Sequence, residues 1–153
     1  MKGRAFPLIL FLSAFLCRLL VLAQLSDYPL LNQFGSDPAY YYQKAIAILT
    51  SGNWLGDKIF FASPFYHYFL AVVFVCFGVN FFAVRMIQFV LGSFTAVLLY
   101  LIGLRAFDRK TGILAGIFYC LYWIFPFYEL TLEYDPLLIF FVLLAIYFSF
   151  TLN

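Results

Sequence analysis

The chain has 153 residues, of which 66% are hydrophobic and only 10% are charged, and its formal net charge is +2. A soluble domain carries about a quarter charged residues, so this composition excludes a water-soluble globule and predicts a polytopic helical membrane protein. The apolar runs are continuous rather than alternating, which argues against a membrane β-barrel. The sequence contains no basic patch of the kind that binds nucleic acid, so we expect no nucleic-acid partner.

The first expected membrane helix is the apolar run over residues 6–24. Lys2 and Arg4 precede this run, which is also the pattern of a cleavable signal peptide ending near Ala23. Arg18 interrupts the run, and its length at about 1.5 Å per residue suffices to cross roughly 30 Å of hydrocarbon. We therefore predict an uncleaved transmembrane helix with a cytoplasmic N terminus.

A polar interval over residues 24–63 contains the second expected helix. Asp37 is predicted to cap a helix over 37–50, with proline at the first helical position and Gly52 as the stop. The next apolar run, 64–78, has about fifteen residues and is short for a span. Both helices are expected to lie along the membrane surface. The predicted apolar face of the first of them consists of Ala39, Tyr42, Ile46 and Leu49.

The distribution of charge predicts how the remaining runs cross the membrane. Three further runs are taken as crossings: 81–104, 111–126 and 136–152. If 64–78 does not cross, five basic residues all lie on one side of the membrane. This arrangement is favoured, because positively charged loops prefer the cytoplasmic side. These residues are Lys2, Arg4, Arg105, Arg109 and Lys110; the acids on the outer side are Asp27, Asp37, Asp57, Glu129, Glu133 and Asp135. The predicted fold is all-α and multi-pass in the cell membrane, with about four transmembrane helices and two juxtamembrane helices in the first outer loop.

Two acidic segments of this predicted outer face are candidates for chemistry: Asp37, and the pair Glu133 and Asp135. Carboxylates that meet at a water–lipid boundary can hold a divalent cation, or one of them can act as a general base toward a hydroxyl. The alternative is that Asp37 only caps a helix and the pair are ordinary loop acids before a proline. His67 is the only histidine, and without a spaced partner it is more typical of a structural residue than of a metal ligand.

Arg18 and Arg85 are cations inside apolar runs. Such residues are costly in a membrane and usually face a cavity, a partner carboxylate or a ligand, although both could also extend to the outer headgroups. A lipid phosphate would satisfy either guanidinium group. Two other patterns indicate packing: the small residues Gly112 and Gly116, and the three cysteines, which lie in apolar runs without metal-ligand spacing.

The order of these features resembles the N-terminal part of the GT-C membrane glycosyltransferases, in particular the protein-mannosyltransferase-like (dolichyl-phosphate-mannose–protein mannosyltransferase) group. The resemblance covers most of the chain and depends on the order and spacing of short motifs. These are Asp37-Pro38-Ala39-Tyr40-Tyr41 with Ala45 and Ser51-Gly52, Ser63-Pro64-Phe65-Tyr66 through Phe77-Gly78, Ala83-Val84-Arg85, the basic turn from Arg105 to Gly112, and Phe125-Pro126 through Glu133-Tyr134-Asp135.

The resemblance implies transfer of a sugar from a polyprenyl-phosphate carrier to a protein, lipid or glycan acceptor at the outer membrane face. Asp37 would act as the base or orient the acceptor. The second acid corresponds best to Asp135, with Glu133 as the competitor, and it would assist or hold a divalent metal ion if one is required. The implied substrate-binding residues are Arg85, Arg18 and Tyr41.

The chain also departs from this family. Some relatives carry a second acid directly after the first, where this sequence has Pro38 after Asp37. The family has further crossings and usually a C-terminal outer domain, so residues 1–153 are expected to be a truncated N-terminal transmembrane module with part of a site. The alternative function is a non-catalytic membrane protein that binds or moves a lipid phosphate through Arg18 and Arg85, or an inactive fragment.

Overall fold

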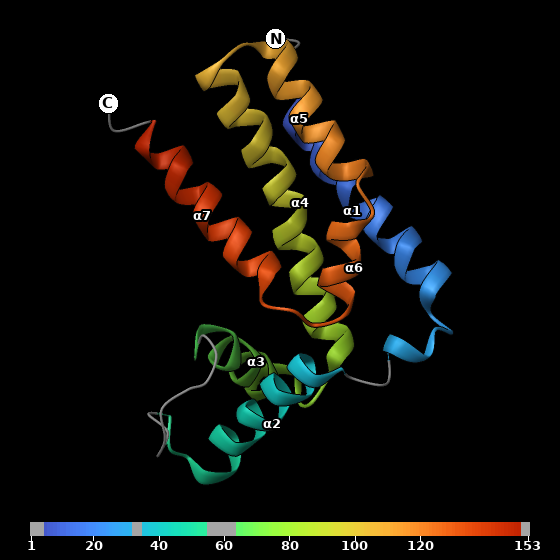
Figure 1. The fold of residues 1–153 in the computed structure, drawn as a ribbon, viewed down its shortest axis with the longest axis vertical. Coiled ribbons are helices and arrows are strands. Elements are labelled where there is room, and N and C mark those ends of the chain that lie inside the picture. The colour runs from blue at the N-terminus through green and yellow to red at the C-terminus, as the bar shows by residue number, and fades with distance from the viewer. Residues whose placement is uncertain (1–4, 32–34, 55–63, 151–153) are drawn as a thin grey trace.

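The computed structural model describes residues 5–31, 35–54 and 64–150, and within these ranges it contains helices and no strands (Figure 1). The predicted all-α fold is therefore confirmed. The elements in chain order are α1 (Ala5–Leu25), the 3₁₀ helix η1 (Pro29–Leu31), α2 (Ser36–Ser51), α3 (Pro64–Phe77), α4 (Phe81–Ala106), α5 (Arg109–Leu121), α6 (Ile124–Leu130) and α7 (Asp135–Ser149).

Helix α4 is the centre of a bundle in which it packs against α1, α5 and α7 (Figure 1). Among the described residues, α1 and α4 are each long and apolar enough to cross a membrane, and α5 with α6 forms a third candidate span that is bent by 50°. Helix α7 is apolar and lies beside α4, but its 15 residues are fewer than a full span needs. The four predicted crossings thus agree with the observed helices in position, while by length two or three of them qualify.

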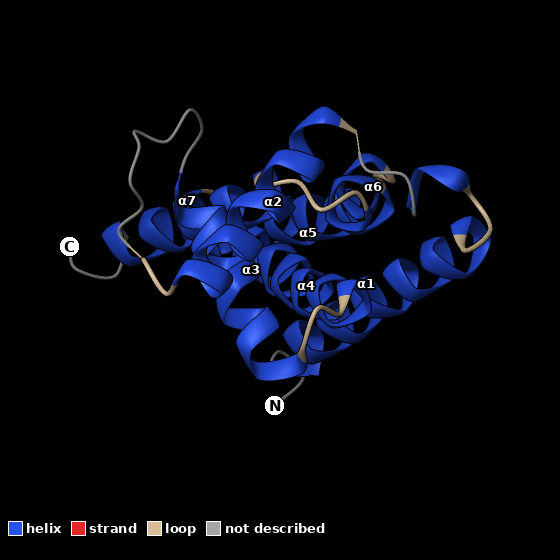
Figure 2. Cartoon of the chain, turned by 90° about the horizontal axis from the view of Figure 1, so that it is seen from below, coloured by secondary structure: helices blue, strands red, loops and turns tan. Residues whose placement is uncertain are grey.

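Helices α2 and α3 lie together beyond one end of the bundle, and the view from below in Figure 2 shows them in front of it. Both predicted helices are present and lie outside the bundle, and their position along the membrane surface stays a prediction. Their interface is formed by buried residues three or four apart, the spacing of one helix face. These residues are Tyr41, Ala45 and Ile48 from α2, and Tyr66, Leu70 and Phe74 from α3; Ala71, Val73, Val84, Leu132 and Leu137 complete the buried cluster. The face predicted for α2 is displaced by one residue from the buried face. It is partly buried, at the edge of this interface.

The two ends of α2 differ in how well the sequence predicted them. Gly52 has φ +66°, and its N–H donates to the carbonyl oxygen of Ile48, so the predicted glycine stop is confirmed. The predicted cap is wrong, because Gly35 occupies the N-cap position and Asp37 lies within the first turn. A carboxylate there still interacts favourably with the partial positive charge of the helix N terminus.

A basic cluster and an acidic cluster lie at opposite ends of the bundle (Figure 1). The turn between α4 and α5, which carries Arg105, Arg109 and Lys110, lies at the end opposite α2 and α3. Asp37 belongs to α2, and the segment between α6 and α7 carries Glu133 and Asp135 at the same end as α2. The basic cluster and these three acids therefore lie at opposite ends of the bundle, with Asp108 beside the basic cluster and Lys44 and Arg85 at the end of the acids.

Candidate active site

The structure brings the two acidic segments together. Asp37 comes from the first turn of α2, Glu133 from the turn after α6, and Asp135 from the start of α7. Burial, together with the negative charges of Asp37 and Asp135, raises the pKa of Glu133 from its ordinary value of 4.5 to about 7. A carboxyl group with such a pKa can take up and release a proton near neutral pH, as general acid–base chemistry requires.

Aromatic rings from three elements enclose one side of these acids. The ring of Tyr41 is edge-on to Tyr66 at 5.1 Å, to His67 at 5.3 Å and to Tyr134 at 6.2 Å, measured between centroids. Burial, followed by the charges of Glu133 and Asp37, raises the pKa of Tyr41 to about 12. Its phenol therefore stays neutral, so that its hydroxyl remains available to donate a hydrogen bond beside the carboxylates.

His67 is wholly buried within this aromatic wall. Burial lowers its pKa, which favours the neutral ring and agrees with the structural role predicted for a lone histidine. Among the residues that the structure describes, no group of three or more histidine, cysteine, aspartate or glutamate side chains is arranged to hold a metal ion.

One face of α4 holds the acidic turn in place. The Arg85 side chain donates through Nε to the carbonyl oxygen of Leu130 at 3.0 Å and through Nη2 to that of Leu31 at 2.6 Å. Gln88, one turn later, donates to the carbonyl oxygen of Glu133 at 3.0 Å. Between these contacts Leu132 has φ +61°, a conformation that costs a non-glycine residue about 1–2 kcal/mol. The turn that presents Glu133 is thus sharp and held by side chains of α4.

Arg85 also lines a pocket of about 570 Å³ at the start of α4. The other lining residues include Leu31, Phe77, Asn80 and Phe82. An arginine has more N–H donors than the two that these hydrogen bonds use, so this side chain can bind an anion while the protein holds it. The geometry is compatible with the substrate-binding role predicted for Arg85.

Arg18 has a partner inside the protein. Its Nε and Nη2 donate to the two carboxylate oxygens of Glu129 at 2.6 and 2.8 Å, and its Nη1 donates to the carbonyl oxygen of Ala14 at 3.1 Å. Both side chains of the ion pair are 0% exposed. Arg18 therefore does not extend to the headgroups, and Glu129, predicted to be an outer-loop acid, is instead buried on α6.

A comparison of the sequence with protein families found a match. The model of the dolichyl-phosphate-mannose-protein mannosyltransferase family matches residues 62–152, more than half of the chain. The chain belongs to this family. No curated protein and no solved structure matches the chain.

The mannosyltransferase family match covers α3 to α7 and therefore includes Arg85, Glu129, Glu133 and Asp135. Asp37 and Tyr41 precede the matched segment, and their connection to the site rests on the geometry of α2. The resemblance drawn from the sequence motifs is confirmed at the level of the family, which is one of membrane glycosyltransferases.

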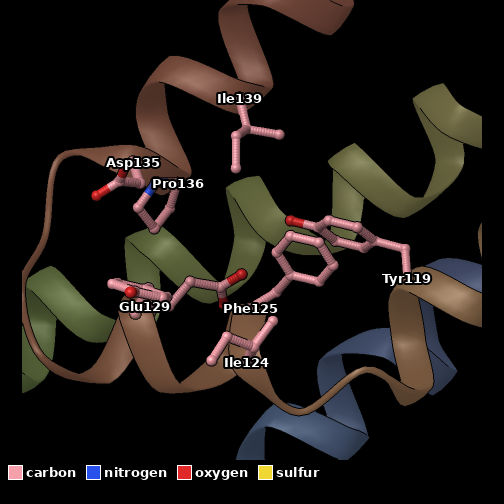
Figure 3. Close-up of a pocket in the computed structure, with 8 residues that line it drawn as sticks. Tyr119, Ile124, Phe125, Glu129, Asp135, Pro136 and Ile139 are labelled. Carbon is pink, nitrogen blue, oxygen red and sulfur yellow. The ribbon is translucent and has the colours of Figure 1, made fainter.

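A second cavity of about 210 Å³ lies between α5, α6 and α7 (Figure 3). In Figure 3 the Tyr119 hydroxyl and the Glu129 carboxylate point into it from different sides, and Asp135 with Pro136 borders it at α7. The ring of Tyr119 stacks on that of Phe125 at 4.2 Å. This largely apolar cavity connects the buried ion pair with the acidic turn.

Sequence reasoning missed the structural roles of two residues of this candidate site, Gln88 and Glu129. Gln88 carries no signal in the sequence, because an amide in an apolar run is compatible with many roles. Glu129 could have been identified from Arg18, since a buried guanidinium group needs a carboxylate partner. The choice among the available acids required the fold, because 111 residues separate the two.

Proposed function

We propose that this chain forms the acidic part of a glycosyltransferase site that transfers mannose from a polyprenyl-phosphate carrier to a hydroxyl acceptor. The observation that carries this proposal is the convergence of Asp37 with Glu133 and Asp135 at the end of the bundle away from the basic turn. The family to which the chain belongs supplies the class of reaction and, through its name, the class of donor.

In the proposed reaction the carboxylate of Glu133 accepts the proton of the acceptor hydroxyl. The acceptor oxygen then forms a bond to the anomeric carbon of the sugar, and the bond from that carbon to the phosphate oxygen breaks. The electron pair of the broken bond stays with the lipid phosphate. The pKa of about 7 that burial and the two neighbouring acids give Glu133 supports its role as the base at neutral pH.

The other residues have roles that follow from their positions. Asp37 raises the basicity of Glu133 through its charge and can orient the acceptor hydroxyl, and Asp135 contributes in the same way. The neutral phenol of Tyr41 can donate a hydrogen bond to the substrate. Arg85 can contact the lipid phosphate from its pocket. Arg18 has no direct part in this scheme, because its guanidinium group binds Glu129.

The proposed orientation places the acidic end outside the cell. Positively charged loops favour the cytoplasm, and the basic turn between α4 and α5 lies at the opposite end of the bundle. Sugar transfer would then occur at the extracytoplasmic face, on acceptors that reach α2 and the acidic turn from the aqueous side.

The test is a transfer assay on the full-length enzyme in membranes, with radiolabelled mannose on a polyprenyl phosphate as donor. Asp37→Asn and Glu133→Gln should each lower the transfer rate by a factor of about 10² or more, the range found for general acid–base groups. Asp27→Asn is the matched control, because Asp27 is an exposed acid just after α1. Wild-type transfer rates in both site variants would contradict the proposal.

A second function, binding of a lipid phosphate without catalysis, is favoured by the position of Arg85 in its pocket. The two functions differ in what Asp37→Asn does. If the site is catalytic, this variant still binds the lipid-linked donor but does not transfer the sugar. If the wild-type protein binds the donor, transfers nothing and loses binding in Arg85→Gln, the binding function is correct.

A further inference from the structure

We infer that the buried Arg18–Glu129 ion pair positions the candidate active site by fixing α6, and with it the turn that carries Glu133 and Asp135, against α1 and α4. This inference rests on the proposed function, and it assigns positioning roles to two residues that touch neither substrate in that scheme. The geometry of the pair, its contact with α4 and the shortness of α6 support it.

The pair fixes an orientation as well as a distance. Arg18 uses two donors on the two oxygens of Glu129, at 2.6 and 2.8 Å, and such a fork restrains rotation of the carboxylate about its own axis. A third donor of Arg18 binds the carbonyl oxygen of Ala14 one turn earlier, which holds the guanidinium group against its own helix. Helix α6 is thereby linked to α1 in one defined arrangement.

Helix α4 closes the third side of the pair at Gly92. A Cβ atom at this position would lie 2.1 Å from Oε1 of Glu129 and 2.6 Å from Nη2 of Arg18. No side chain larger than hydrogen is compatible with both contacts, so the sequence of α4 leaves space for the ion pair. Three helices therefore meet at one buried salt bridge.

The same face of α4 continues from the pair to the acidic turn. Gly92, Gln88 and Arg85 are three or four residues apart and lie along one side of the helix. Gln88 binds the carbonyl oxygen of Glu133, and Arg85 binds that of Leu130. The segment from Glu129 to Glu133 is thus held at both ends.

The seven residues of α6 are too few to form a stable helix without tertiary contacts, so these contacts determine where it lies. A buried ion pair is a weak source of stability, because replacing it with apolar residues of similar volume is often neutral or stabilising. The geometric restraint is lost in such a replacement. Because an apolar replacement can keep the stability while it removes the restraint, it distinguishes a positioning role from a merely structural one.

The test uses the double variant Arg18→Met/Glu129→Leu in the full-length enzyme reconstituted in nanodiscs. Spin labels report the distance between α2 and α6. They are attached at the exposed positions Gln43 on α2 and Tyr128 on α6, in a background without the native cysteines. We expect a broader distance distribution and a kcat lowered by about 10-fold to 100-fold, with an unchanged KM for the lipid donor, since small displacements of reacting groups have effects of this size.

Gly92→Ala should give the same two changes, because its methyl group forces the pair apart without altering any charge. The matched control is Gly116→Ala, whose Cβ would lie 2.7 Å from the flexible end of Leu10 and 3.2 Å from the carbonyl oxygen of Ala96, a crowded helix contact away from the ion pair, and it should change the distance and kcat less than Gly92→Ala does. Wild-type distance and kcat in the apolar double variant would overturn the inference. Loss of folded protein in that variant would also overturn it, because the pair would then serve stability.

The two measurements separate this inference from the proposed function. If the wild-type enzyme transfers no sugar, the proposed function is wrong, and the distance distributions alone decide whether the pair positions α6. If the wild-type enzyme is active and the distances do not respond to the substitutions, only the positioning role is wrong.

Discussion

The carboxyl group of Glu133 combines partial burial with two negative neighbours, Asp37 and Asp135, which come from separate elements. Each of these conditions favours the protonated form, and together they bring its pKa to about 7. The same shift has a consequence for stability, because the folded protein must hold a carboxylate in an unfavourable place once the proton leaves.

We predict that the free energy of unfolding falls as pH rises between about 4.5 and about 7. In this window folded Glu133 retains a proton that the unfolded chain has released, and stability is lost as that proton dissociates. The side chain keeps contact with solvent, so the loss should be about 1 kcal/mol rather than the full value of the shift. Thermal unfolding at about pH 5 and about pH 8 measures it.

The control for this prediction is Glu133→Gln, which removes the titrating group while keeping the shape of the side chain. The difference in unfolding temperature between the two pH values should shrink in this variant and persist in Asp27→Asn. An unchanged difference in Glu133→Gln would show that other groups produce the pH dependence.

At the scale of single residues, the sequence indicated which residue types to examine but left their partners open. Arg18 was identified as an unusual cation, and the structure places it in the bundle with Glu129. Asp37 was identified as a helix cap, and the structure gives the cap position to Gly35. In both cases the outcome depends on backbone geometry or on distant segments, which local patterns do not specify.

The elements themselves follow closely from local signals. The helix over the apolar run 64–78 was predicted, and α3 occupies Pro64–Phe77, with Gly78 at φ +70° directly after it. The break between α5 and α6 was not predicted, because residues 111–126 are continuously apolar and read as one helix. The pattern of hydrophobicity does not report the bend of 50° between these two helices.

At the element scale, the end of α2 offers a test of backbone conformation. Gly52→Ala should destabilise the last turn by about 1 kcal/mol, because a Cβ atom is disfavoured at positive φ. Gly52→Asn should cost less, since asparagine tolerates this conformation better. Hydrogen exchange at the amides of the last α2 turn measures both, and equal protection in the two variants would contradict the prediction.

At the scale of the whole molecule, the separation of basic and acidic ends is the property that connects fold with proposed orientation. The composition predicted a helical membrane protein, and the charge distribution predicted which segments share a side. Both predictions rest on features of the whole chain, so they do not depend on single caps or helix faces; the helical class is confirmed, and the sidedness stays a prediction. The convergence of α2 with the acidic turn could not be predicted from composition or charge distribution, because it depends on how α3 and α4 pack.

The proposed orientation predicts the accessibility of introduced cysteines. In a cysteine-free background, a cysteine at Lys110 should react with a membrane-impermeant thiol reagent only after the cells are opened. A cysteine at Gln43 on α2 should react in intact cells. Reaction of the Lys110 position in intact cells would contradict the orientation and leave the fold unaffected.

The close contact between α4 and α5 also bears on how the protein enters the membrane. A Cβ atom at Gly103 would lie 2.6 Å from the Cα atom of Gly112, so the two backbones touch immediately beside their connecting turn. Contacts between residues this close in the chain form quickly and lose little chain entropy. Helices α4 and α5 can therefore partition into the bilayer as a preformed hairpin, and α7 would then dock against a surface that already exists.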